Sequence, residues 1–149
     1  MKPVCLVLGA GRGIGGTVGA HFAKAGYHAV LCRRSDDAGL QALISGIVDA
    51  GGEATGYLMN AVDDEVIEHR VAAIEADIGP IDTVVYNLGA QIGSRRLEET
   101  SYKAFEMGWR MATFGLFRVA QAVAPKMRER GRGNLLVTSA TAAVRGNQG

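Results

Sequence analysis

The sequence is poor in proline and cysteine and has no long hydrophobic run, and each shortage excludes a class of protein. Three prolines accompany 21 glycines that neither recur at a fixed period nor gather in a polar tract, which excludes collagen-like and low-complexity chains. The two cysteines lie in apolar stretches, so we expect buried thiols in a reduced, cytoplasmic protein. No apolar run approaches the roughly 18 residues of a membrane span, and no signal peptide precedes the first apolar run. We therefore expect no membrane partner.

The chain also has little excess charge. Its 16 basic and 15 acidic residues leave a net charge of +1, which gives no reason to expect a nucleic acid as partner. Arg128, Arg130 and Arg132 form a basic run that suits the end of a helix, where cations are favoured. The histidines are scattered, so no metal site is predicted. A length of 149 residues fits one globular domain over 1–149.

What the sequence does have is a regular alternation of apolar runs and helical patterns. Short apolar runs predict five strands, at residues 3–9, 28–32, 53–60, 81–87 and 133–140. Apolar residues at helical spacing predict helices over 14–25, 36–50, 63–78 and 100–130, with Ser35 or Asp36 capping the second and Thr100 or Ser101 the fourth. Right-handed crossovers then give an α/β fold with a doubly wound, Rossmann-like parallel sheet of order 3-2-1-4-5. A ligand crevice is expected where strands 1 and 4 end.

The predicted helix over 101–130 is apolar on two faces. One face repeats at helical spacing, and a second is added by Met107, Met111, Phe114 and Phe117. We therefore expect the helix to be covered on both sides. We predict a homo-oligomer formed through this helix, although a helix wedged under its own neighbours would show the same pattern.

The turn after the first strand reads LGAGRGIGG and contains two overlapping glycine patterns. Gly11, Gly13 and Gly16 satisfy G-x-G-x-x-G, and Gly9, Gly13 and Gly15 satisfy G-x-x-x-G-x-G. We favour the second, because it places Gly9 at the strand end, where a tight turn has to begin. A strand before the turn and a helix opening near Ile14 form the setting in which a pyrophosphate meets a helix N-terminus, and the Ile14 amide can donate to phosphate. The turn therefore predicts a dinucleotide site.

The end of the second strand, LCRRSDD, indicates which dinucleotide binds. A carboxylate there would accept hydrogen bonds from the adenosine ribose and favour NAD, but Cys32 and Arg33 occupy the position. The two aspartates come later, in the cap of the next helix. Arg33 and Arg34, joined by Arg12 from the glycine turn, are planar donors suited to a 2′-phosphate. We predict that the three arginines meet with no carboxylate beside them, and that the cofactor is NADP(H).

These two stretches resemble the short-chain dehydrogenase/reductase family in its NADP-using form, with Leu8 where the family usually has threonine. The resemblance covers the whole chain and implies further cofactor contacts. MNAVDD, at the end of the third strand, is similar to the family's aspartate and small apolar residue beside the adenine. Asn60 and Ala61 take those two positions, and Asn60 can still hydrogen-bond the adenine edge.

The end of the fourth strand, YNLGA, resembles the family's Asn-Asn-Ala-Gly motif. Asn87 and Gly89 match the motif, whereas Tyr86 and Leu88 depart from it. The resemblance implies that this stretch lines the adenosine side and pins the central strand. Tyr86 is the tyrosine nearest the cofactor, but no lysine partner is evident, so we do not expect it to act as an acid.

The resemblance also implies a reaction, hydride transfer between a nicotinamide and a small carbonyl or alcohol substrate. The family uses a tyrosine as acid and base, a lysine, a serine and a helix asparagine. Aligned with the family, Ala112 stands where the asparagine belongs and Ala140 where the serine belongs. Ser139, one residue earlier, is the catalytic candidate, although a shift of one residue along a strand changes the face. The Tyr-x-x-x-Lys motif would lie past Gly149.

Three interpretations are open on the sequence. In the favoured one, the chain is the N-terminal part of an NADP(H)-dependent short-chain oxidoreductase, truncated before the elements that complete the family fold and inactive by itself. A chain end here would leave the fifth strand as an exposed edge, which complete proteins usually cover. In the second, it is an NADPH-binding pseudoenzyme or sensor module without turnover. In the third, it is a structural partner that completes its sheet with another chain.

Overall fold

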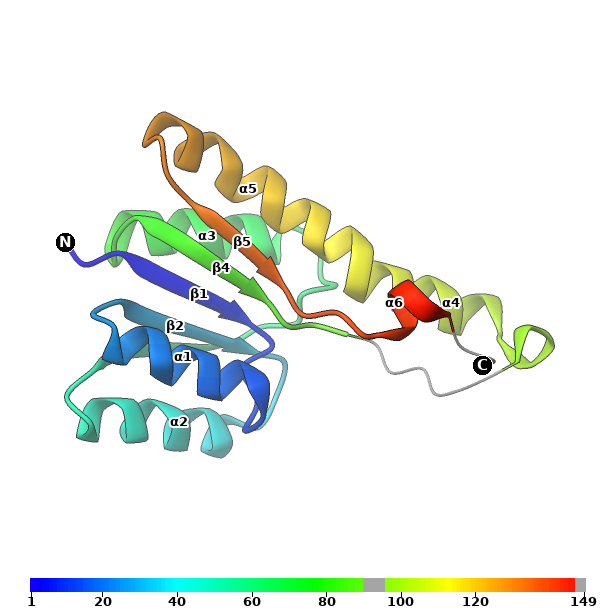
Figure 1. The fold of residues 1–149 in the computed structure, drawn as a ribbon, viewed down its shortest axis with the longest axis horizontal. Coiled ribbons are helices and arrows are strands. Elements are labelled where there is room, and N and C mark those ends of the chain that lie inside the picture. Colours follow the sequence, from blue (N-terminus) through cyan, green and yellow to red (C-terminus); the bar gives the residue numbers. More distant parts are fainter. Residues whose placement is uncertain (90–95, 147–149) are drawn as a thin grey trace.

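A five-stranded parallel sheet is the centre of the computed structural model, which describes residues 1–89 and 96–146 (Figure 1). The strands are β1 (Val4–Leu8), β2 (His28–Arg33), β3 (Glu53–Leu58), β4 (Ile81–Tyr86) and β5 (Asn134–Val137). Their order is β3-β2-β1-β4-β5, and every neighbouring pair is parallel. The predicted doubly wound fold and its strand order are confirmed.

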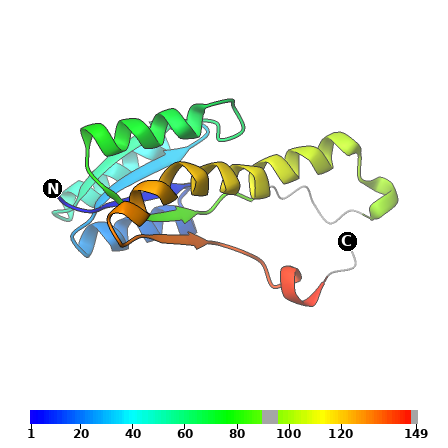
Figure 2. The same cartoon turned by 90° about the horizontal axis from the view of Figure 1, so that it is seen from above.

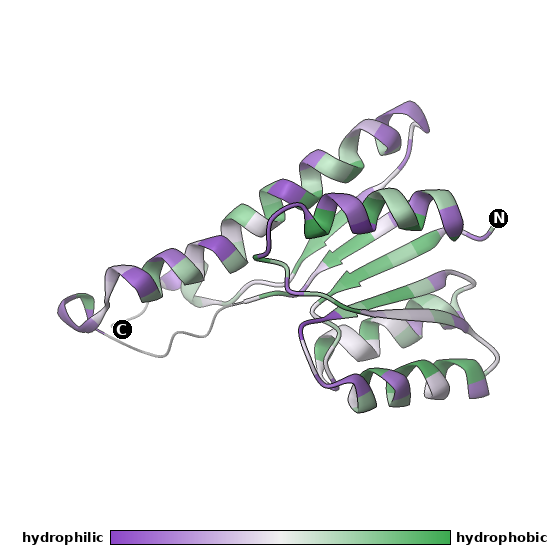
Figure 3. Cartoon of the chain, turned by 180° about the vertical axis from the view of Figure 1, so that it is seen from behind, coloured by the Kyte–Doolittle hydropathy of each residue, from purple (hydrophilic) through white to green (hydrophobic). Residues whose placement is uncertain are grey.

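Helices cover both faces of the sheet. One face carries α1 (Ile14–Lys24) and α2 (Asp37–Asp49), and the other carries α3 (Val66–Asp77) and α5 (Gly115–Glu129) (Figure 1). Successive side chains of a strand point to opposite faces, so Leu6 packs in the α3–α5 layer and Val7 in the α1–α2 layer. Because both faces are covered, the central strands are hydrophobic along their length (Figure 3).

The winding of the chain reverses between β1 and β4. The chain leaves β1 for α1 on one face and leaves β4 for the long helix on the other, and α/β proteins usually bind ligands at the carboxyl ends of two such adjacent strands. The turn after β1 and the ends of β2 and β3 lie at the same edge of the sheet. This edge is where the candidate site is built.

The predicted long helix is one rod in three parts. These are α4 (Tyr102–Trp109), a π-helical turn (Arg110–Phe114) and α5. The Ser101 hydroxyl caps the rod by accepting from the Ala104 N–H at 3.2 Å. A helix of this length spans about 42 Å, whereas a six-residue strand spans about 20 Å. The first half of the rod therefore projects past the sheet (Figures 1 and 2).

α4 is not covered by the described part of the chain. None of its residues is buried there, and Tyr102 and Phe105 are 96% and 66% exposed. The expectation that both faces of the helix are covered is therefore wrong for α4, as far as cover from the described part of this chain is concerned. The apolar pattern continues past the end of the sheet that would cover it.

Two element boundaries differ from the prediction by three residues, and the other differences are of one or two residues. α3 begins at Val66 and not at the aspartate pair, because Asp63 accepts a hydrogen bond from the Asn60 side chain at 2.8 Å and stays in the turn. β5 ends at Val137, and a short helix that was not predicted, α6 (Ala142–Arg145), follows it.

Two predicted segments lie partly outside the described residues. The loop predicted over 88–99 includes residues 90–95, and the C-terminal stretch includes residues 147–149. In the described ranges, no helix is long and apolar enough to cross a membrane.

Candidate functional site

The glycine turn after β1 fits tightly against the end of β4. Gly9 has a φ of +92°, and a Cβ there would lie 2.8 Å from the carbonyl carbon of Asn87. A Cβ at Gly15 would lie 3.0 Å from the side-chain nitrogen of Asn87. Gly13 differs, because a Cβ there would meet no described atom within 4 Å. Two of the predicted glycines therefore allow the turn to pack against the protein, and the third leaves space for a ligand.

The start of α1 lies directly after this turn. Gly13 is its N-cap residue, and within the described structure no side chain caps the helix. Its first turn carries no acidic residue, and the side chains of Arg12 and Ile14 are exposed. The amides and dipole of a helix N-terminus attract anions. The turn and the helix start can together hold a diphosphate.

Asn87 joins three strand ends at the crevice. Its side-chain nitrogen donates to the Gly9 carbonyl at 3.0 Å, and its backbone N–H donates to the Leu8 carbonyl at 2.8 Å. Its side-chain oxygen accepts from the Thr138 hydroxyl at 2.8 Å. The side chain thereby pins β1 and β4 to the residue that follows β5. Thr138 has no part in the sequence prediction.

A small cavity of about 30 Å³ lies at the ends of β1, β2 and β3. It brings together five predicted cofactor residues, namely Gly9, Arg33, Arg34, Asn60 and Ala61. The other lining residues are Leu8, Cys32, Met59, Val62, Leu88 and Met111. Burial raises the pKa of the Cys32 thiol to about 12, so this wall is neutral. Its apolar lining, with guanidinium and amide groups beside it, has the chemistry that contacts an adenosine, but its volume is only about that of one water molecule, so a base must displace part of the lining to enter. We call this space the adenosine-side cavity.

Arg33 is paired with Asp36, although the position of this carboxylate in the cap of α2 predicts that it lies too far away. Its Nη2 lies 3.0 Å from Oδ2 of Asp36, and Oδ1 of Asp36 accepts from the Gly39 N–H at 2.9 Å. The expectation that no carboxylate stands beside the arginines is therefore wrong. Asp36 has a left-handed backbone (φ 69°), which turns its side chain back toward the end of β2. The prediction that Asp36 or Ser35 caps α2 is confirmed for Asp36.

The second terminal nitrogen of Arg33, Nη1, is buried and has no hydrogen-bond partner among the described residues. Arg12 lies nearby, because Arg12, Asp36 and Gly39 line an open depression of about 410 Å³. Arg34 is exposed beside Arg33 in the adenosine-side cavity. The three predicted arginines therefore border two adjoining hollows, with Asp36 among them. A larger groove of about 540 Å³ runs between α1 and α2, from Arg12 of the glycine turn to Gly52.

Arg118 of α5 braces the loop that carries Asn60 and Ala61. Its Nη1 donates to the carbonyls of Ala61 at 3.2 Å and Asp63 at 3.1 Å. Its other nitrogens form a bidentate pair with Glu68 of α3, at 2.8 and 2.6 Å. Hydrogen bonding from this guanidinium lowers the pKa of the Glu68 carboxyl. The side chain of Arg118 thus fixes the adenosine-side loop to two helices.

Tyr86 is buried at the end of β4, and its hydroxyl donates to the Met111 carbonyl. Burial raises its pKa to about 12, and the positive charge of Arg118 offsets this only in part. A neutral phenol that is bonded inside the protein is unsuited to proton transfer. The surroundings of Tyr86 are therefore those of a structural residue, as expected from its lack of a lysine partner.

The residues aligned with the family's catalytic positions lie at the open end of the sheet. Ser139 and Ala140 are exposed between β5 and α6, and Ala112 is exposed in the π-helical turn. Gly89 is exposed directly before the first residue outside the described range. Within residues 1–89 and 96–146, no group of three His, Cys, Asp or Glu side chains could hold a metal ion.

Comparison with known proteins identifies the family. A family model described as short chain dehydrogenase matches residues 3–149. The chain belongs to this family. It is 38% identical over 133 residues to gluconate 5-dehydrogenase of Gluconobacter oxydans, a match that covers 88% of this chain and 50% of that protein. The short-chain dehydrogenase resemblance drawn from the glycine turn and the strand ends is confirmed.

Solved structures of short-chain dehydrogenases share the fold. One is a gluconate 5-dehydrogenase from Burkholderia cenocepacia in complex with NADP and tartrate, with 29% identity, a TM-score of 0.80, and coverage of 92% of this chain and 53% of that one. Another is 7α-hydroxysteroid dehydrogenase complexed with NADH and 7-oxo glycochenodeoxycholic acid, with 25% identity, a TM-score of 0.90, and coverage of 98% and 56%. The chain spans about half the length of the relatives it matches.

Apart from the apolar residues at the strand ends that line the cavity, four residues of this short-chain dehydrogenase site have no part in the cofactor site predicted from the sequence, namely Asp36, Met111, Arg118 and Thr138. Arg118 had a usable signal, because a charged residue stands beside Val119 in the apolar stripe of the long helix. Asp36 had a partial one, since a helix cap three residues after an arginine can reach its guanidinium. Thr138 and Met111 act through long-range contacts that leave no local pattern.

Proposed function

We propose that this short-chain dehydrogenase binds NADP(H) and is the cofactor-binding part of a cytoplasmic oxidoreductase that transfers hydride between a nicotinamide and a carbonyl or alcohol substrate. The observation that carries the proposal is Nη1 of Arg33, a buried guanidinium nitrogen without a described partner. A donor without an acceptor is unfavourable. Nη1 lies against Gly39 and has almost no accessible surface, so the Arg33 side chain must turn outward for Nη1 to bind an anionic oxygen of a ligand. A 2′-phosphate has the charge and geometry that a guanidinium recognises.

The rest of the site supports the same cofactor. The space over Gly13 and the uncapped start of α1 fit a diphosphate, and the lining of the cavity beside Ala61 has the chemistry that contacts an adenosine. Relatives have been solved with NADP and with NADH, so the choice for this chain rests on its own arginines. The nicotinamide of the bound cofactor supplies or accepts the hydride. The residues of this chain bind the adenosine and diphosphate and orient them at the crevice.

The chemistry at the substrate is proposed from the alignment with the family. Ser139 is the residue of this chain that we propose to contact the substrate oxygen, because it follows β5 at the carboxyl edge of the sheet. Ala112 and Ala140 carry no polar group, so they cannot orient water or substrate as asparagine and serine do. In this proposal the Tyr-x-x-x-Lys pair follows Gly149, and residues 1–149 bind the cofactor without turnover.

Titration with NADPH and NADH, followed by the fluorescence of Trp109, tests the proposal. Replacing Arg33 and Arg34 by alanine should weaken NADPH binding at least about ten-fold and NADH binding less than about three-fold, because only NADPH carries the 2′-phosphate. Arg128→Ala, an exposed charge near the end of α5, is the control for the loss of positive charge. Equal losses for both cofactors would contradict the assignment to NADP(H). Binding of neither cofactor would reject the function.

Asp36 gives a second test of the same site, because its carboxylate competes with a 2′-phosphate for Arg33. Asp36→Asn removes the charge but keeps an oxygen to accept from the Gly39 N–H, so the cap of α2 is preserved. NADPH should bind about three- to ten-fold more tightly to this variant, with NADH unchanged. Asp37→Asn removes the neighbouring charge, which pairs with Gln41 and not with an arginine. A matching gain in Asp37→Asn would show that only net charge is responsible.

We also propose that the chain forms a homo-oligomer through the apolar face of the long helix, residues 101–130. The described structure exposes five aromatic side chains there, namely Tyr102, Phe105, Trp109, Phe114 and Phe117. A second copy would bury an apolar patch that this chain leaves open. Phe105→Glu should lower the sedimentation coefficient, and Gln121→Glu, an exposed site on α5, should not. A monomeric wild type would contradict the proposal.

A further inference from the structure

The long helix changes its hydrogen-bond register where it passes the crevice. At the π-helical turn, the Gly115 N–H donates to the carbonyl of Arg110, five residues back, and not to that of Met111. The Met111 carbonyl thereby loses its usual α-helical donor. The Tyr86 hydroxyl donates to it instead.

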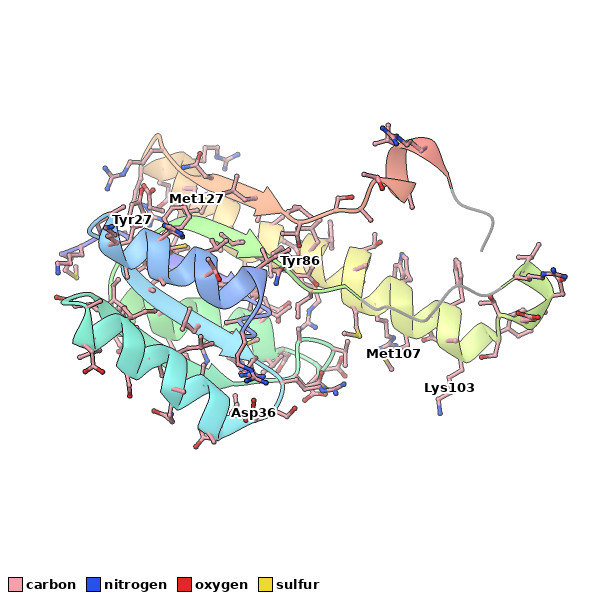
Figure 4. All side chains as sticks on the ribbon, turned by 60° about the horizontal axis from the view of Figure 1, so that its bottom comes forward. Tyr27, Asp36, Tyr86, Lys103, Met107 and Met127 are labelled. Atoms are coloured by element: carbon pink, nitrogen blue, oxygen red, sulfur yellow. The ribbon has the colours of Figure 1, made fainter. Side chains whose placement is uncertain are left out.

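Tyr86 fits in this place because Gly115 has no side chain. It lies at the end of β4, is 1% exposed and faces the long helix (Figure 4). A Cβ at Gly115 would collide with the Tyr86 hydroxyl and would lie 3.4 Å from the ring carbon that bears it. The tyrosine and the glycine are therefore a matched pair across two elements.

The turn held in this way carries one wall of the adenosine-side cavity. Met111 lines the cavity together with Ala61, which lies in the loop after β3. The same helix also holds that loop, because Arg118 donates to the Ala61 carbonyl at 3.2 Å. A methionine side chain is flexible enough to move aside for a planar ring and close over it. The backbone position of Met111 thus decides how well the cavity fits a base.

We propose that Tyr86 is a positioning residue for the adenosine half of a dinucleotide: its hydroxyl bonds the Met111 carbonyl, fixes the π-helical turn and so holds the Met111 side chain against the base. This inference rests on the proposed function and assigns a role in it to a residue that touches neither the ligand nor the solvent. The effect is confined to the adenosine end of the site. The nicotinamide end does not depend on it.

Calorimetric titration with adenosine 2′,5′-bisphosphate, which contains no nicotinamide, tests the proposal. Tyr86→Phe removes only the hydroxyl, and the Kd of this variant should be about five- to ten-fold higher, the effect of one lost hydrogen bond. Tyr27→Phe is the matched control, because the Tyr27 hydroxyl donates to Asp82 at 3.1 Å at the opposite end of the sheet. Its Kd should equal that of the wild type.

Methionine methyl resonances supply a signal that a general loss of stability would not produce. In the wild type, the Met111 methyl should shift when the bisphosphate is added, whereas Met107 on the projecting α4 should not. In Tyr86→Phe, the Met111 resonance should be displaced before the ligand is added and should respond less to it. An unchanged Met111 response in this variant would overturn the proposal.

Gly115→Ala tests the geometry independently. In the wild-type background it should weaken bisphosphate binding by about the same factor as Tyr86→Phe, and in the Tyr86→Phe background it should add little. If Gly115→Ala does not fold, the Tyr86→Phe titration still decides. A folded Tyr86→Phe variant that binds the bisphosphate like the wild type overturns this inference alone. A wild type that binds neither NADPH nor the bisphosphate overturns the proposed function, and this inference with it.

Discussion

The two halves of the long helix have similar sequence patterns and opposite environments. α4 carries apolar residues at helical spacing, yet none of its residues is buried within the described chain. α5 continues the same pattern and buries Gly115, Arg118, Val119 and Val123 against the sheet and α3. The difference arises because the helix is longer than the strands. α5 lies along the sheet, whereas α4, on the other side of the π-helical turn, extends beyond it (Figure 2).

The comparison shows what helical periodicity can and cannot establish. An apolar stripe shows that a face is suited to burial, but it does not identify what covers the face. In α5, the cover is the sheet of the same chain, and a charged residue inside the stripe holds the adenosine-side loop. In α4, the described chain supplies no cover. Substitutions matched between the halves measure this difference directly.

The largest effect is expected from the ion pairs. Arg118 is 7% exposed and bonds Glu68 and two loop carbonyls. Arg118→Ala should lower the free energy of unfolding by about 2–3 kcal/mol, less than the loss of a fully buried pair because Glu68 is partly exposed. Arg110→Ala removes the exposed pair with Glu106 at 3.2 Å and should cost less than about 0.5 kcal/mol. Urea unfolding measures both. Equal losses would mean that α4 is covered in solution to the same extent as α5.

The next effect is expected from the apolar stripe itself. Val119 is fully buried, so Val119→Ala should destabilise the protein by about 2 kcal/mol through lost packing. Phe105→Ala should change stability by less than about 0.5 kcal/mol, because its side chain is 66% exposed. Measuring the stability loss of Phe105→Ala at two protein concentrations shows whether Phe105 is buried in an oligomer. A cost that rises with concentration would place Phe105 in an interface between copies.

The fold was predictable because its signals are local. The run at Val4–Leu8, closed by Gly9, identifies a buried strand, and alternation of such runs with helical patterns fixes the order of the sheet. The glycines of the turn were predictable for the same reason, because a positive φ at Gly9 is required at that position in the chain. Family membership then confirmed the resemblance over residues 3–149.

The rest of the site depends on contacts between distant residues. The π-helical turn arises where Tyr86, 25 residues before Met111, supplies a donor to its carbonyl, and no helix pattern encodes that. A charge beside the apolar residue Val119 indicates that Arg118 needs a partner, but the backbone carbonyls that it bonds have no signature in the sequence. Asp36 reaches Arg33 only because its backbone is left-handed, which its residue type permits but does not require.

A smaller effect is expected from pH. Arg118 lowers the pKa of the Glu68 carboxyl in the folded state, so the pair contributes stability above the ordinary carboxyl pKa of about 4.3. That contribution is lost as the pH falls through the lowered value. Glu68→Gln should therefore be less stable than the wild type at neutral pH, and the two proteins should converge in acid. A constant difference between them across this range would show that the charge of Glu68 has no part in holding α3 to α5.

The smallest effect is expected where the two halves of the helix meet. Trp109, at the end of α4, stacks on Phe114 of the π-helical turn with ring centroids 5.1 Å apart and planes 16° apart. Both rings are partly exposed, so Phe114→Leu should change the free energy of unfolding by less than about 0.5 kcal/mol. It should nevertheless shift the emission of Trp109 to the red, because one face of the indole becomes wet. Phe117→Leu, one helical turn further along, is the control and should leave the emission unchanged. If both variants shift the emission of Trp109 equally, the emission does not report the contact with Phe114. The stacked pair then has no particular role where α4 meets α5.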